Sequence, residues 1–283
     1  MTVTAERIAR RRAGNVVFTV FCIVVTIVAL AALAAILWTL VGKGVGGLNL
    51  DVFTMSTPAP GSRGGLANAI VGSIMMCGLA MVIAVTVGVL AGTWLAEYGG
   101  RSYYGSLVRF INDVLLSAPS ILVGLFVYVI LVAPLKGFSG IAGAVALALL
   151  AVPLITRTTE DVLTLQAATL REAGVALGAP LSLVIQDILW RSARSGLLTG
   201  ALLAFARISG ETAPLLFTAL NNQFFSLDMT QPTANLPVVI FNFALSAQEN
   251  WQQLAWVGAL LIAATVLAVT IFARLLAQET KRS

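Results

Sequence analysis

Six apolar stretches dominate this chain, and their length decides the class of fold. A bilayer core about 30 Å thick takes about 20 apolar residues in a helix. The stretches are residues 16–41, 68–96, 111–133, 140–156, 196–220 and 254–273. The fourth is shorter than the others but carries no charge. Only 10% of all residues are charged, against about 25% in soluble proteins. The sequence therefore predicts an all-α, polytopic membrane helix bundle with six transmembrane helices.

The chain has no histidine among its 283 residues. This excludes Ser-His-Asp triads, histidine general bases and most zinc sites. The sequence also has no G-x-x-x-x-G-K-[ST] loop that could bind ATP. We therefore predict no catalytic residue, no metal site and no cofactor bound by this chain.

The distribution of Lys and Arg predicts the orientation in the membrane. On alternate sides of the predicted spans the loops and tails carry 13 and 3 of these residues. Cytoplasmic loops carry the excess, so we expect both termini in the cytoplasm, as an even number of crossings requires. The first stretch, about 26 residues long, exceeds the 7–15 of a signal peptide and is interpreted as a permanent anchor. The basic charge thus follows from topology, and no nucleic-acid partner is expected.

One cytoplasmic loop, residues 157–195, is long for a connector in a compact helical protein. Thr169 to Glu172 fits a capping box, Gly178 fits a left-handed helix end, and Pro180 would stop the helix. The pattern predicts a helix of about eight residues, which would be marginal alone in water and needs a partner. A solvated connector with ordinary helix signals is the alternative interpretation.

The same loop resembles the EAA motif of bacterial ABC importer permeases, which reads E-A-A, three residues, G, nine residues, I-x-L-P. Four residues match it in register, Glu172, Ala173, Gly178 and Ile188, and Gly174 occupies the position of the second Ala. Departures from the pattern are Gly174 for Ala, Trp190 for Leu and Arg191 for Pro. The resemblance implies a coupling helix, with Arg171 included, that seats in a cleft of a separate ATPase. That partner would bind ATP and Mg²⁺.

Two charged residues, Arg207 and Glu211, lie inside the fifth stretch. On insertion scales, the free-energy cost of placing such a residue at the centre of a membrane helix is about 2.5–3.5 kcal/mol. At positions i and i+4 the two can pair, and Pro214 predicts a kink there. An arginine fork donates two parallel hydrogen bonds and suits a tetrahedral oxyanion. The alternative is an ion pair that only holds helices together.

A glutamate one turn from the arginine should repel an anion. Either Glu211 pairs with an arginine of a partner subunit, or the two residues separate as the pathway opens. The sequence leaves both possibilities open.

Four segments resemble the PstA-type permeases of phosphate ABC importers. They are residues 95–98 (LAEY), 117–128, 157–160 (RTTE) and 204–218. The resemblance implies a MetI-like, type I permease fold in a bacterial plasma (inner) membrane, working as the permease subunit of an importer of inorganic phosphate. It also implies a PstC-like second permease, a PstB-like ATPase dimer and a PstS-like phosphate-binding protein outside. Pathway roles carry over to Arg207 and Glu211. Ser120, Ser209 and Thr212 are further candidates because their side chains carry hydroxyl groups.

This interpretation divides the chain into three parts. Residues 1–66 form a basic tail, the first anchor and an outer loop. Residues 67–276 form the permease domain, which includes the coupling loop at about 157–195. Residues 277–283 form a cytoplasmic tail. A permease for another oxyanion, such as sulfate or molybdate, is the nearest alternative. A secondary transporter would show inverted repeats and several intramembrane acids, and a channel needs no coupling helix.

Two further patterns have two interpretations each. Gly88 with Gly92, and Gly196 with Gly200, have GxxxG spacing that suits close helix contact, or arise by chance in a glycine-rich chain. The outer segment 221–250 contains an apolar run at 238–245. That run is either a re-entrant turn or a plain surface loop.

Overall fold

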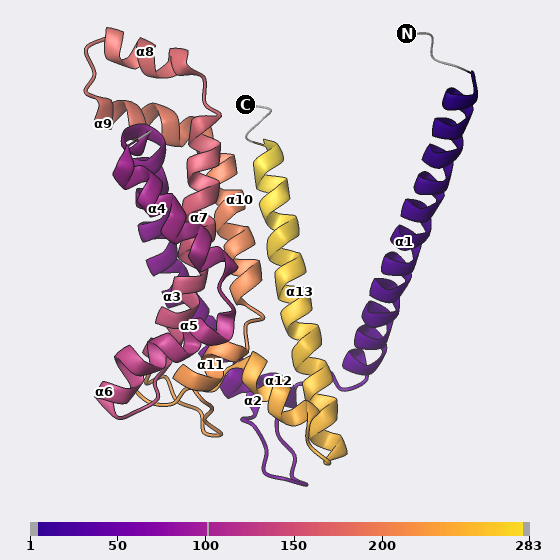
Figure 1. Cartoon of the computed structure of the whole chain (residues 1–283). Coiled ribbons are helices and arrows are strands. Elements are labelled where there is room, and N and C mark those ends of the chain that lie inside the picture. The colour runs from indigo at the N-terminus through magenta and orange to yellow at the C-terminus, as the bar shows by residue number, and fades with distance from the viewer. Residues whose placement is uncertain (1–4, 101, 280–283) are drawn as a thin grey trace.

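A computed structural model describes residues 5–100 and 102–279, and every regular element among them is helical. Four described helices, or helix segments, are long and apolar enough to span a membrane. They belong to α1 (Ala5–Val45), α3 (Ala67–Trp94) with its π-helical extension η1 (Leu95–Gly99), α7 (Gly140–Thr164) and α13 (Glu249–Glu279) (Figure 1). The predicted all-α membrane bundle is confirmed.

The third predicted span is not one straight helix. It consists of α4 (Tyr103–Ser117) and a second part, α5 (Ser120–Val127), η2 (Tyr128–Val132) and α6 (Ala133–Leu135). The two parts are bent by 106°. The cause is Pro119, because a residue before proline is pushed out of the helical region, and Ala118 has φ −66° and ψ 135°. Counted as one span, the bent pair is the fifth candidate.

The predicted span 196–220 is also interrupted. Helix α10 (Trp190–Ile208) ends six residues before Pro214, which lies in the first turn of α11 (Ala213–Thr218). Proline is favoured at a helix start, where its missing N–H needs no partner. The prediction of a helix kinked at Pro214 is therefore wrong, since the chain breaks at 209–212 instead. The count of six spans stays a prediction that this arrangement is compatible with.

Helix α7 packs between α3 and α10, and glycines bring the three backbones together. A Cβ atom on Gly92 would lie 2.5 Å from the carbonyl oxygen of Thr156, and one on Gly88 would lie 2.8 Å from Ile155 Cβ. On the other side of α7, a Cβ atom on Gly196 would lie 2.6 Å from Val162 Cγ1. Both GxxxG pairs therefore serve close helix contact, as small residues do in membranes. The chance interpretation is wrong.

Adding one methyl group at this contact should loosen the bundle. We expect Gly92→Ala to lower the free energy of unfolding by about 1–3 kcal/mol, because the added atom meets backbone that cannot rotate away. The measurement is the unfolding midpoint in detergent. Gly78→Ala is the matched control, since it lies in the same helix with nothing within 4 Å of the new Cβ atom. An equal drop in both variants would contradict the role of the contact.

The apolar run 238–245 lies largely within a helix that is buried along more than half of its length. Helix α12 (Leu236–Ala244) begins at Asn235, whose side chain accepts a 2.9 Å hydrogen bond from the Val238 N–H. Val239 and Phe243 pack with residues of α3 and α13 in one apolar cluster. The surface-loop interpretation is therefore wrong.

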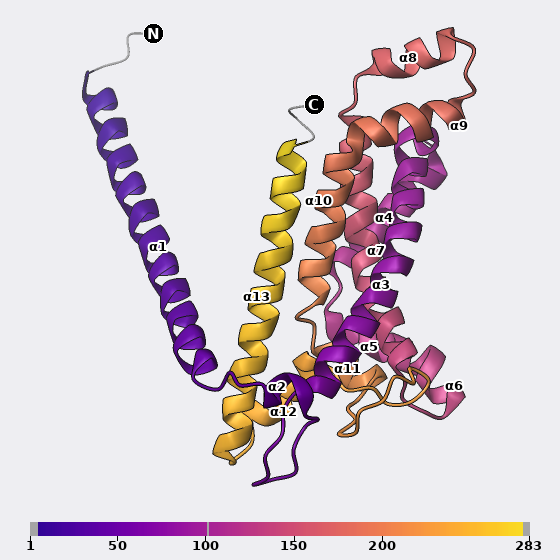
Figure 2. The ribbon, with the colours of Figure 1, turned by 180° about the vertical axis from the view of Figure 1, so that it is seen from behind.

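The ends of the long helices are arranged as an even number of crossings predicts. The start of α1, the end of α13 and the short helix α8 (Ala168–Ala176) lie at one end of the molecule (Figures 1 and 2). Helix α1 contacts α13 at the opposite end, where Gly44 faces Leu260. The shared side of the termini fits the predicted topology.

Candidate coupling segment and translocation site

The loop between α7 and α10, called the coupling segment here, comprises residues 165–189. It contains α8, α9 (Leu181–Leu183) and η3 (Val184–Leu189). Helix α8 ends as predicted, with Gly178 at φ +82°. The Gly178 N–H donates to the Val175 carbonyl at 2.9 Å, and the Ala179 N–H donates to the Gly174 carbonyl at 3.2 Å. These two bonds form a Schellman motif, which favours glycine at this position.

The start of α8 differs from the prediction. The helix begins at Ala168 with Ala167 as its N-cap and no side-chain capping bond. Thr169 lies inside the helix, so the predicted capping box is wrong.

Arg171 anchors α8 to the rest of the molecule. Its Nη2 and Nε atoms donate to the two carboxylate oxygens of Glu97 at 2.6 and 2.8 Å. The guanidinium also donates to the carbonyls of Gln166 at 3.0 Å and Leu163 at 2.9 Å. The hydrogen bond to Glu97 raises the pKa of Arg171 above its usual value. Since the Glu97 side chain is only 3% exposed, the pair is a buried, bidentate anchor.

The other EAA residues divide between an outer and an inner face of α8. Glu172 and Ala173 are exposed, and the last turn also exposes Val175 by 53% and Leu177 by 88%. These four residues form what we call the outer face of α8. Their exposure leaves a carboxylate and apolar side chains available to a partner.

Gly174 lies on the inner face and explains the first departure from the EAA pattern. A Cβ atom there would lie 2.7 Å from Val184 Cγ2 and 3.2 Å from Ile188 Cδ1. An alanine at this position would thus push α8 away from η3. In this chain the glycine allows a β-branched residue to pack beneath α8.

The other two departures also have structural roles. The Trp190 indole Nε1 donates a 3.1 Å hydrogen bond to the Thr93 hydroxyl of α3. Arg191 forms a 3.3 Å ion pair with Asp187, and both side chains are exposed. Exposed pairs of this kind contribute little to stability, so the Trp190 contact is the more consequential of the two.

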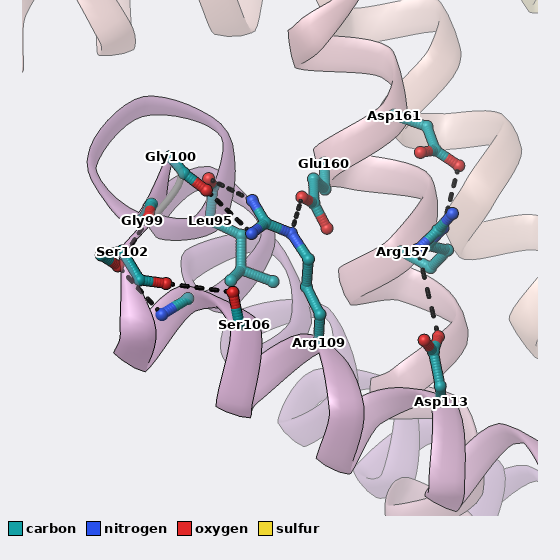
Figure 3. A network of polar contacts seen from close by, with 11 residues as sticks. Leu95, Gly99, Gly100, Ser102, Ser106, Arg109, Asp113, Arg157, Glu160 and Asp161 are labelled. Atoms are coloured by element: carbon teal, nitrogen blue, oxygen red, sulfur yellow. Dashed lines mark hydrogen bonds and ion pairs between the residues drawn. The ribbon is translucent and has the colours of Figure 1, made fainter.

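A second buried carboxylate fastens α4 to α7. Arg109 Nε lies 2.6 Å from Glu160 Oε1, and the Glu160 side chain is 12% exposed (Figure 3). The same guanidinium donates to the carbonyls of Gly100 at 2.9 Å and Leu95 at 3.3 Å. The pair thereby closes the turn between α3 and α4.

Arg157, next to this pair, has a more open environment. It lies 3.4 Å from Asp161 and 4.0 Å from Asp113, and all three side chains are about half exposed (Figure 3). Within the 157–160 signature, Glu160 is therefore the buried structural member and Arg157 the accessible one.

The break between α10 and α11 holds four of the five predicted pathway residues. Arg207 lies in the last turn of α10 and is exposed, whereas Glu211 is half-buried. Among the described residues no ion pair joins them. The helix ends at Ile208, so the two side chains do not occupy successive turns. The predicted i,i+4 pair is therefore wrong for this structure, as is its role in holding helices together.

The hydroxyl candidates lie at the ends of the broken helices. Ser209 donates a 2.6 Å hydrogen bond to the Phe205 carbonyl, and Thr212 is the N-cap of α11 without a side-chain capping bond. Ser120 opens α5. One turn further, a Cβ atom on Gly124 would lie 2.6 Å from Pro214 Cα. Helices α5 and α11 thus cross closely, and the structure brings the two breaks to neighbouring positions.

Comparison with known proteins assigns this architecture to a family. The family model described as binding-protein-dependent transport system inner membrane component matches residues 84–282. The phosphate transport system permease protein PstA of Haemophilus influenzae is 55% identical over 246 residues, 87% of each chain. The chain belongs to the PstA family.

Other relatives and one solved structure agree with this placement. The PstA protein of Yersinia pestis is 55% identical over 247 residues, 87% of this chain and 84% of that protein. The probable PstA of Methanocaldococcus jannaschii is 36% identical over 74% of this chain and 75% of that protein. A structure of the MetNI methionine ABC transporter in an inward-facing conformation has a TM-score of 0.61 at 17% identity, covering 75% of this chain and 94% of that one. This likeness supports the MetI-like fold.

The roles of two PstA signatures could not be found from the sequence. Residues 95–98 supply Glu97, and residues 157–160 supply Glu160. Their partners lie 74 and 51 positions away along the chain. For Glu97 the signal was an acidic residue directly after an apolar stretch, whereas Glu160 lies among other polar residues and carried no such signal.

Proposed function

We propose that this chain is one of two permease subunits in an ABC importer that moves inorganic phosphate into the cell. The names of its PstA relatives support the substrate, and their identity over most of the chain supports the same role here. A PstC-like permease, a PstB-like ATPase dimer with ATP and Mg²⁺, and a PstS-like binding protein would complete the assembly. The coupling segment and both termini would face the cytoplasm.

The observation that carries the mechanism is the exposure of Arg207 at a helix break. Arg207 lies eleven positions along the helix from Gly196, the residue at which the fifth apolar stretch begins. This corresponds to a rise of about 16 Å, or about half of the bilayer core. Contact with lipid there would cost about 2.5–3.5 kcal/mol on insertion scales. The Arg207 face should therefore meet a polar passage shared with the second permease.

Phosphate could bind at this face through the planar fork of Arg207. Two guanidinium N–H groups would donate to two phosphate oxygens, and the hydroxyls of Ser120 and Thr212 would add neutral donors nearby. The Ser209 hydroxyl would become a donor only after releasing the Phe205 carbonyl. Glu211, which forms no described ion pair, would either meet a cation of the second permease or compete with phosphate for Arg207. Such competition would keep the anion from binding too tightly to leave.

Transport by the reconstituted complex tests the proposal. Proteoliposomes containing both permeases and the ATPase should accumulate labelled phosphate when ATP and the binding protein are supplied. Labelled sulfate and molybdate offered to the same vesicles are the competing substrates. Accumulation of sulfate or molybdate without phosphate would overturn the assignment of substrate.

A further inference from the structure

Two polar contacts from the coupling segment and its border end on the same stretch of α3–η1. Arg171 reaches Glu97 and Trp190 reaches Thr93. The two acceptors are four residues apart, about one helical turn. Thr93 is 6% exposed and the Glu97 side chain 3%. We call these two contacts the α3 ties.

Of the α3 ties, the Arg171–Glu97 pair attaches the coupling segment to a rigid part of the molecule, and the Trp190–Thr93 contact fixes the start of α10, where the segment ends. Gly88 and Gly92 press α3 against α7, and Gly196 presses α10 against α7. Close-packed backbones of this kind transmit displacement instead of absorbing it. Because Arg207 lies at the end of α10, the same three-helix block carries the candidate pathway residue.

Helix α8 has little else to fix its orientation. It has nine residues, with Gly174 as its buried residue, and its remaining packing includes Leu170 against the cluster of Leu163, Ile185, Leu189 and Ala193. Apolar contacts of this kind are not directional. A bidentate arginine–carboxylate pair, in contrast, fixes both distance and angle.

We propose that Glu97 is the positioning residue that makes α8 and the α3–α7–α10 block move as one body, while Thr93 fixes the start of α10 to α3 within that block. A displacement of α8 by the ATPase would then reach the α10–α11 break without being lost as tilting of the helix. This inference rests on the proposed importer function. It deepens that function by naming the elements through which coupling passes.

The decisive variant is Glu97→Gln in the complete reconstituted complex. It keeps the shape of the side chain but removes the charge that holds Arg171. We expect amide hydrogen exchange in α8 to become at least tenfold faster. Phosphate transported per ATP hydrolysed should fall at least fivefold, while basal ATP hydrolysis changes less than twofold. A merely structural role would lower the yield of complex and leave this ratio unchanged.

Asp187→Asn is the matched control, because it removes a carboxylate from an exposed ion pair in the same segment. It should change neither exchange nor the transport ratio. Arg171→Lys keeps the charge but loses the bidentate fork, so its ratio should lie between those of the wild type and Glu97→Gln.

If Glu97→Gln prevents assembly, Arg171→Lys tests the same pair in an assembled complex, where exchange in α8 should again be faster than in the wild type. Trp190→Leu introduces the residue of the EAA pattern and removes the other α3 tie, so it should increase exchange at the start of α10. Wild-type exchange and wild-type transport per ATP in the assembled variants would overturn the inference. Failure of the wild-type complex to carry phosphate would instead count against the proposed substrate, and the exchange measurements would still decide whether the Arg171–Glu97 pair holds α8.

Discussion

Replacing Arg207 by glutamine should lower phosphate uptake by at least about 100-fold in reconstituted vesicles. Hydrogen bonds to charged groups contribute about 1.5–3 kcal/mol each, and glutamine cannot supply the two that the arginine fork would make. A loss of about 3 kcal/mol corresponds to more than a hundredfold in rate. Initial rates of labelled phosphate uptake, normalised to the amount of assembled complex, are the measurement.

The matched control for this variant is Arg191→Gln, the same change in the first turn of the same helix. Arg191 is 79% exposed and pairs only with exposed Asp187 among the described ion pairs, so uptake should stay near the wild-type rate. Assembly should survive in both variants, because Arg207 holds no described ion pair. Uptake at the wild-type rate in Arg207→Gln would remove this residue from the pathway.

Exchanging the two charges adds a second test of the site. In Arg207→Glu with Glu211→Arg, the total charge is preserved but the arginine moves from the end of α10 to the break. Since the native residues form no described pair, the swapped protein should lose phosphate uptake. Normal uptake would mean that only mutual neutralisation matters.

Local patterns predicted the elements whose causes are local. The apolar stretches located the long helices, since hydropathy reports what lipid requires. Gly178 and Pro180 located the end of α8, because the left-handed conformation and the missing N–H act within a few residues. The glycine pairs indicated close helix contact, although the sequence could not say which helices would meet.

Features that depend on distant residues could not be predicted. Thr169 has the right neighbours for a cap, but α8 begins at Ala168, and it is held to the molecule by Arg171 and Glu97, which are 74 positions apart. The bend at Pro119 was not predicted because apolar residues continue on both sides of it. Hydropathy does not report the direction of the helix axis. Arg207 and Glu211 were expected to pair because a spacing of four residues brings side chains together only in an unbroken helix. In the structure α10 ends at Ile208, before Glu211.

Reversing the charge of Glu172 should have the largest effect on assembly with the ATPase. This carboxylate lies on the outer face of α8 beside the apolar Val175 and Leu177, and exposed apolar groups of this kind mark a surface for a partner. Losing a desolvated polar contact at an interface costs about 2–5 kcal/mol. We expect Glu172→Lys to reduce copurification of the ATPase by at least tenfold, with phosphate uptake falling in parallel.

The matched control is Asp187→Lys, which makes the same charge change in the same segment. Asp187 lies on η3, and its side chain is 59% exposed in a surface ion pair, where such changes cost little. Helix α8, which carries Glu172, stands beyond the helix that starts at α9, at the end of the molecule (Figure 1), so a partner approaching along this direction meets α8 first. Equal losses of ATPase in both variants would indicate a general effect of charge, and unchanged recovery in Glu172→Lys would show that the partner binds elsewhere.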